Sequence, residues 1–104
     1  MLDLIREEFM KDERNNKNLR LLFFQGEDCG LCQGMEIKVK RELSSYKLPL
    51  DLIELKTHPK LRGEYGVYSF PTLLLLEGDK EIERTSGFFD LERIKRFLDL
   101  HKSL

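Results

Sequence analysis

The chain has 104 residues, with 18 basic and 19 acidic side chains and a net charge of −1. This balance excludes the basic excess typical of proteins that bind nucleic acids or anionic membranes, and the length suits one domain spanning residues 1–104. No apolar run approaches the roughly 20 residues that a membrane-spanning helix needs. The first residues carry several acids and no long apolar segment, so we expect no signal peptide and a cytoplasmic protein.

The first two elements are predicted from apolar spacing. Leu2, Ile5 and Phe9 recur at helical intervals among charged residues, which predicts an amphipathic N-terminal helix. The run from Leu19 to Gln25 is mostly apolar and contains two phenylalanines. It predicts a strand that is buried on both faces and lies centrally in a sheet.

A second helix follows, with an apolar stripe of Leu31, Met35, Val39, Leu43 and Tyr46. The later segments show four signals in turn. These are strand alternation after Pro49, Pro59 in a position suited to a first helical turn, a tight turn at Gly78-Asp79, and Asp90, which suits a helix start. They predict a strand at Leu50–Lys56, a short helix from Thr57 that ends by Gly63 or Gly66, a hairpin of Thr72–Glu77 with Glu81–Thr85, and a last helix after Asp90.

The element order is α-β-α-β-α-β-β-α. A right-handed crossover makes the first two strands parallel, and the hairpin adds two antiparallel strands. The sequence therefore predicts an α/β fold, a mixed four-stranded sheet flanked by helices on both faces.

The chain has two cysteines, Cys29 and Cys32, and they lie where the first strand meets the second helix. Unpaired N–H groups and the helix dipole favour a thiolate there, and thiolate is the reactive form. Redox chemistry is the favoured interpretation of this Cys-x-x-Cys motif in a cytosolic protein. Two alternatives stay open: buried structural thiols, and half of a zinc or iron–sulfur site that a homodimer would complete.

The motif Cys29-Gly30-Leu31-Cys32 in this element order resembles the thioredoxin family. Ser69-Phe70-Pro71-Thr72 before the third strand matches that family's proline motif, and Gly87 matches a glycine beside the same site. The resemblance covers about Leu19 to Leu100. The N-terminus departs from it, because an N-terminal helix stands where thioredoxins usually begin with a strand.

The resemblance implies a thiol–disulfide oxidoreductase that needs no cofactor and no metal. Cys29 would attack a substrate disulfide, and the more buried Cys32 would then resolve the mixed disulfide. The Phe70–Pro71 bond would be cis. Substrate contacts would come from Phe70, Pro71, Gly87 and Phe88.

Three departures from the family bear on the chemistry. Asp28 replaces a tryptophan beside Glu27, and these two acids should oppose ionisation of Cys29. Leu31 stands where thioredoxins have proline. The family's buried aspartate is Phe23 here and its lysine partner is Leu52, so Glu54 is a candidate proton acceptor for Cys32.

The sequence thus predicts a monomeric enzyme of cell redox homeostasis. Its partners would be protein disulfides and a thiol reductant or a recycling enzyme like thioredoxin reductase. A binding module that has kept the fold but lost catalysis is the alternative from another class.

Overall fold

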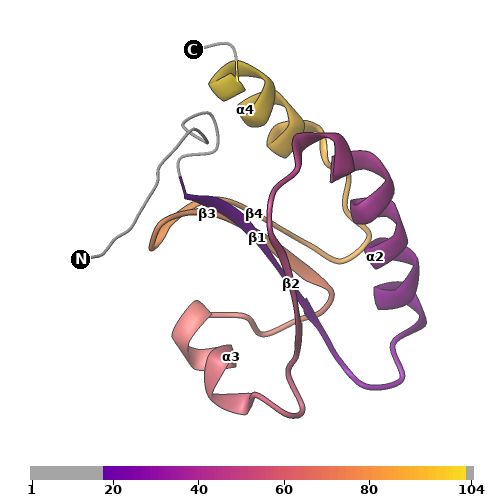
Figure 1. The fold of residues 1–104 in the computed structure, drawn as a ribbon. Helices are drawn as coiled ribbons and strands as arrows, with labels where there is room; N and C mark the ends of the chain where they lie inside the picture. The colour runs from indigo at the N-terminus through magenta and orange to yellow at the C-terminus, as the bar shows by residue number, and fades with distance from the viewer. Residues whose placement is uncertain (1–17, 103–104) are drawn as a thin grey trace.

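The computed structural model describes residues 18–102. The predicted helix at Leu2, Ile5 and Phe9 lies outside these residues. Within them, four strands form one mixed sheet with helices on both faces (Figure 1). The elements are β1 (Leu19–Gln25), α2 (Gly30–Leu43), the 3₁₀ turn η2 (Ser44–Tyr46), β2 (Leu50–Glu54), α3 (Pro59–Tyr65), β3 (Thr72–Glu77), β4 (Lys80–Ser86) and α4 (Glu92–Lys102).

The sheet has the strand order β2-β1-β3-β4. β1 pairs in parallel with β2 and antiparallel with β3, and β3 pairs antiparallel with β4. The central position of β1 and its burial on both faces confirm the prediction for Leu19–Gln25. The C-terminal end of β1, which leads into the cysteine motif, therefore lies at the same edge of the sheet as the end of β2 and the start of β3.

Side chains alternate between the two faces of the central strands. Leu21 and Phe23 of β1 pack with Leu73 and Leu75 of β3 against α2 and α4. The even-numbered neighbours in β1 and β3 pack on the side of α3 instead. In Figure 1, α2 and α4 lie together on one side of the sheet and α3 lies on the other. This two-sided burial explains why β1 and β3 are near-continuous apolar runs.

Several element ends differ from prediction: α2 ends at Leu43, so Tyr46 lies in η2, and β4 is one residue longer at each end than Glu81–Thr85. Gly63 lies inside α3, and only Gly66 ends that helix, in the left-handed conformation at φ 64°. β2 ends at Glu54 and not at Lys56, because the chain turns there through hydrogen bonds from Thr57 and His58 N–H to the Glu54 carbonyl.

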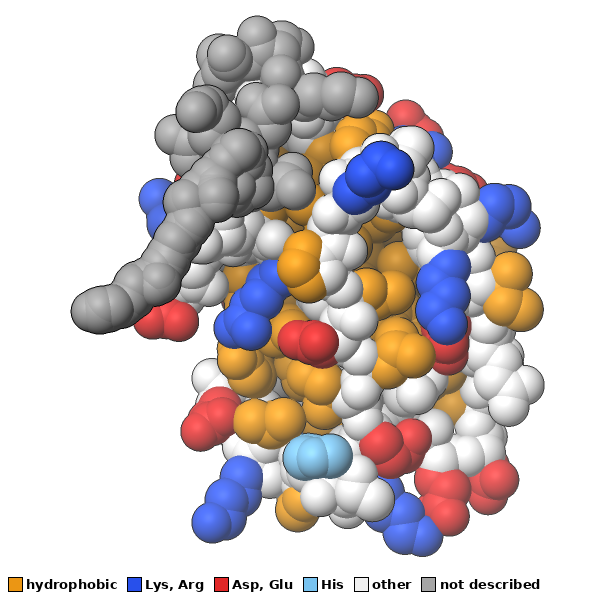
Figure 2. Space-filling model, in the orientation of Figure 1, with side chains coloured by type: hydrophobic (Ala, Val, Ile, Leu, Met, Phe, Trp, Pro, Cys, Tyr) orange, Lys and Arg blue, Asp and Glu red, His pale blue; other side chains and the backbone are white. Residues whose placement is uncertain are grey.

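The outer position of β2 leaves apolar surface on one side of the molecule. Leu52 of β2 is 42% exposed. Figure 2 shows hydrophobic side chains at the surface on the face where β2 is seen edge-on in Figure 1. Among the described residues, none of the helices is long and apolar enough to cross a bilayer.

Candidate functional site

The two cysteines lie at the head of α2 and are joined to each other as a disulfide, with their Cα atoms 5.1 Å apart. Cys29 is the N-cap of α2, and its Sγ accepts a hydrogen bond from the Cys32 N–H at 3.0 Å. Cys29 is partly exposed, whereas Cys32 is 1% exposed. The pair thus has one sulfur that a partner can reach and one that it cannot.

The buried stripe of α2 differs from the predicted one at its first turn. Cys32, Met35, Val39 and Leu43 are buried, but Leu31 is 44% exposed. Leu31 and Cys32 lie four and three residues before Met35, so helical spacing allows either to face the sheet, and the packed helix turns Cys32 inward and Leu31 toward solvent. Cys32 is therefore a packing residue of the helix as well as half of the disulfide.

The acidic turn before Cys29 is bound by a lysine that the sequence did not single out. Asp28 directly precedes the N-cap residue Cys29 and takes the left-handed conformation at φ 54°. Both carboxylate oxygens of Glu27 accept hydrogen bonds from Lys56 Nζ at 2.8 Å. Lys56 follows β2, and only the parallel pairing of β1 with β2 brings it to this turn.

The loop before β3 lies against the end of β4. The Phe70–Pro71 peptide bond is cis, and the Gly87 N–H donates to the Pro71 carbonyl at 2.9 Å. Thr72 is buried, and its hydroxyl hydrogen-bonds the Ser69 carbonyl and the Ser86 hydroxyl. Gly87 has φ 76°, a conformation that favours glycine, and the space around its Cα is open.

Phe70 connects this loop to the cysteine loop. A Cβ atom placed on Gly26 would overlap the Phe70 ring, so the ring packs directly on the Gly26 backbone. Gly26 is the residue between β1 and the acidic turn. The sequence predicted only that Gly26 ends a strand. No local pattern could show that a distant side chain packs against this glycine.

Phe88 is strongly exposed, with 81% of its surface open to solvent. Lys38 Nζ lies 5.5 Å from the centre of the Phe88 ring and donates to the Phe89 carbonyl at 3.0 Å. Phe89 itself is buried in the core. Of these two neighbours, Phe89 is therefore a core residue and Phe88, next to Gly87, is a surface residue.

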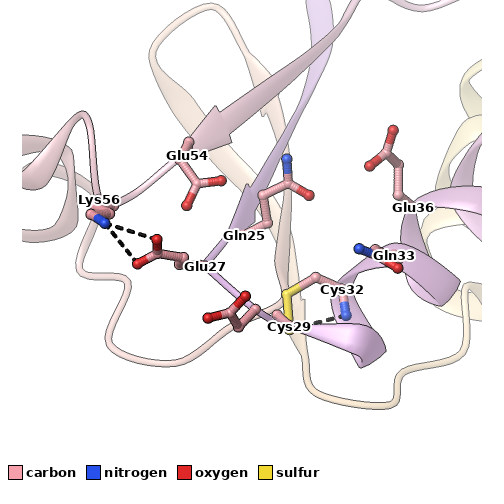
Figure 3. Close-up of a pocket in the computed structure, with 10 residues that line it drawn as sticks. Gln25, Glu27, Cys29, Cys32, Gln33, Glu36, Glu54 and Lys56 are labelled. Carbon is pink, nitrogen blue, oxygen red and sulfur yellow. Dashed lines mark hydrogen bonds and ion pairs between the residues drawn. A yellow bond between two sulfur atoms is a disulfide. The ribbon is translucent and has the colours of Figure 1, made fainter.

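A pocket of about 460 Å³ lies beside the cysteines (Figure 3). Glu54, from the end of β2, reaches into it, and Gln25 lies between Glu54 and the cysteine pair in the view of Figure 3. The Glu54 Oε2 atom is buried and has no hydrogen-bond partner among the residues that the structure describes. The pocket is lined by Gln25, Gly26, Glu27, Asp28, Cys29, Cys32, Gln33, Glu36, Glu54 and Lys56.

The contact between Gly26 and Phe70 predicts the effect of Gly26→Ala. The added methyl group must displace the Phe70 ring, which is already 39% exposed and has solvent to move into. We expect disulfide-exchange turnover to fall about three- to tenfold, while the free energy of unfolding falls by about 1 kcal/mol or less. Kinetics and denaturant unfolding measure the two effects.

Gly34→Ala is the matched control, since Gly34 lies in α2 with nothing within 4 Å of an added Cβ. It should keep full turnover and gain up to about 1 kcal/mol from helix propensity. Equal turnover in the two variants would contradict the role given to the Phe70 contact.

Comparisons with known proteins agree on one family. A family model described as thioredoxin matches residues 1–100. The chain is 31% identical over 86 residues to thioredoxin of Chlamydia caviae, covering 80% of this chain and 82% of that one. It is 29% identical over 105 residues to thioredoxin of Chlamydia trachomatis, covering 98% of this chain and 100% of that one.

Solved structures give the same result for the fold. The thioredoxin NaTrxh from Nicotiana alata superposes with a TM-score of 0.70 at 30% identity, over 80% of this chain and 73% of that one. A mutant thioredoxin from Halobacterium salinarum has a TM-score of 0.72 at 24% identity, over 88% of this chain and 80% of that one. The matched family model and relatives, together with the Cys-x-x-Cys pair, support thiol–disulfide oxidoreductase activity, and the chain belongs to the thioredoxin family.

Proposed function

We propose that this protein reduces or exchanges disulfide bonds of other proteins through the dithiol of Cys29 and Cys32. The observation that carries the proposal is the asymmetry of the pair: Cys29 is partly exposed at the head of α2, and Cys32 is buried one turn further along. An exposed nucleophile with a shielded second thiol suits a two-step exchange, because a substrate can reach only the first sulfur.

In the first step, the Cys29 thiolate attacks one sulfur of a substrate disulfide. The substrate S–S bond breaks, a mixed disulfide forms, and the other substrate sulfur leaves as a thiolate that takes up a proton. The Cys32 N–H, 3.0 Å from Cys29 Sγ, and the N-terminus of α2 both stabilise negative charge on that sulfur. Asp28 acts in the opposite direction and limits how far the thiolate is favoured, and Glu27 does so more weakly because Lys56 is bound to it.

In the second step, Cys32 loses its proton and attacks Cys29 Sγ. The mixed disulfide breaks, the second substrate sulfur leaves as a thiol, and the Cys29–Cys32 disulfide forms with two electrons passed to the substrate. Glu54 is our proton acceptor, because its buried, unpartnered Oε2 lines the same pocket as Cys32. The proton passes to it through a pocket water.

An extended substrate segment would lie along the loop before β3. The ring of Phe70 packs on Gly26 of the cysteine loop, the space at Gly87 is open, and the exposed Phe88 follows Gly87, so these residues offer a surface for such a segment. We propose Phe70, Pro71, Gly87 and Phe88 as the substrate contacts. An external thiol reductant or a reductase then returns the pair to the dithiol, in a reducing compartment such as the cytoplasm, with the protein acting as a monomer.

A direct assay tests the proposed function. The protein is mixed with an oxidised protein substrate and excess small dithiol, and loss of the substrate disulfide is followed against the dithiol alone. A clear acceleration is expected. No acceleration would overturn the proposal and favour a binding module; bound zinc or iron–sulfur absorbance in the reduced protein would favour a metal carrier.

Glu54→Gln separates proton transfer from packing, because glutamine keeps the shape and cannot accept the proton. We expect release of the mixed disulfide to slow about ten- to a hundredfold near neutral pH, with the first attack almost unchanged. Rapid-quench measurement of both steps across pH checks this. Unchanged release at every pH would exclude Glu54 as the acceptor, and Glu36→Gln in the same pocket is the control.

A further inference from the structure

The pocket beside the disulfide carries an excess of negative charge. Its lining includes four carboxylates and one ammonium group, Lys56, although the whole chain is nearly neutral at −1. In Figure 2, acidic side chains gather near the loop that joins β1 to α2 in Figure 1. The four carboxylates are Glu27, Asp28, Glu36 and Glu54.

Among the described residues, the nearby cations pair with two of these four carboxylates and leave the other two, Asp28 and Glu54, without an ion pair. Lys56 is bound to Glu27, and Lys40 is bound to Glu36 at 2.8 Å. Lys38 is drawn away to the Phe89 carbonyl and the Phe88 ring. Asp28, the residue directly before Cys29, makes no ion pair with any of the residues 18–102, and Glu54 keeps one unpartnered oxygen.

We infer that this protein selects disulfides flanked by lysine or arginine and discriminates against anionic disulfides. The inference rests on the proposed function and adds the substrate class to it. A cationic segment entering beside Cys29 meets Asp28 and the rim of carboxylates, whereas an anionic one must approach like charges. Such fields act mainly on the association step and weaken as salt shortens their range.

The test uses two peptides with the same intramolecular disulfide, one flanked by two lysines and one by two glutamates. Flanking charge also changes the reactivity of the peptide sulfurs themselves, so each rate is divided by the rate with dithiothreitol alone. At low ionic strength, the corrected rate for the lysine peptide should be about tenfold higher. In about 1 M salt, where the screening length is about 3 Å, the ratio should fall below about twofold.

The double variant Asp28→Asn with Glu36→Gln should reduce the low-salt ratio to about threefold or less. Asp79→Asn, an exposed residue of the β3–β4 turn at the other end of the sheet, is the matched control and should keep the full ratio. Using a ratio of two substrates removes any change in Cys29 reactivity, because that change multiplies both rates equally.

Each outcome has a separate meaning. Equal corrected rates for the two peptides, or a ratio that the double variant leaves unchanged, would overturn the charge inference while leaving the exchange activity in place. Failure to reduce either peptide faster than dithiothreitol alone would overturn the proposed function itself.

Discussion

Replacing Cys29 with serine is expected to lower disulfide-exchange turnover at least about a thousandfold, because a serine hydroxyl stays protonated near neutral pH and does not attack sulfur. Serine is nearly the same size, and the site is partly exposed, so the fold should persist. The protein-disulfide reduction assay measures the loss, and a far-ultraviolet spectrum with denaturant unfolding checks the fold of the reduced proteins.

Cys32→Ser is the companion variant, and it should stop the reaction at the second step and not at the first. It keeps the attacking sulfur but has no thiol to release the substrate, so a mixed disulfide through Cys29 should accumulate. Mass spectrometry of unreduced protein after one exposure to substrate detects the added mass. The assignment of the two roles would be contradicted if Cys32→Ser formed no adduct, or if Cys29→Ser formed one through Cys32.

Phe23→Asp should unfold much of the protein, although it restores the residue type that resemblance to thioredoxins places at this position. Phe23 has no exposed surface and packs among Leu21, Leu73, Leu75 and the helices α2 and α4. An aspartate there leaves a cavity and buries a carboxyl group with no partner, since its neighbours in β2 and β3 are Leu52 and Leu73. We expect a loss of about 4–6 kcal/mol, close to the whole stability of a small domain.

Denaturant unfolding under identical reducing conditions measures this loss. Phe23→Leu is the control, since it keeps an apolar side chain and should cost only about 1–2 kcal/mol. A Phe23→Asp protein as stable as Phe23→Leu would show that the site can accommodate a carboxyl group. The large loss, by contrast, would explain why any acid that serves Cys32 must come from elsewhere, such as Glu54 at the end of β2.

The fold was predictable wherever the chain pattern is strong over several residues. β1 and β3 are buried on both faces, so almost every side chain in them is apolar and their assignment needed no tertiary information. The cysteine pair and the loop at Pro71 were also predictable, because each is a short motif at a strand boundary. The structure places both at the same edge of the sheet, as the element order requires.

Contacts between distant segments were not predictable. The pairing of Lys56 with Glu27 and the packing of Phe70 on Gly26 each join residues of different loops. Local spacing does not indicate such pairs, since the first arises only when β1 and β2 align in parallel and the second only when β1 and β3 align antiparallel. Leu31 was misassigned for a related reason: the helical period was right, but it allows either Leu31 or Cys32 to continue the stripe, and only packing on the sheet decides between them.

The burial of Cys32 within the stripe of α2 has a consequence for chemical damage. An oxidant or alkylating agent in solution meets the Cys29 sulfur first, while the Cys32 sulfur is shielded by the same packing that holds the helix on the sheet. Irreversible oxidation or alkylation is thereby confined to the Cys29 sulfur. The Cys32 thiol remains unmodified as long as the packing of α2 on the sheet is intact.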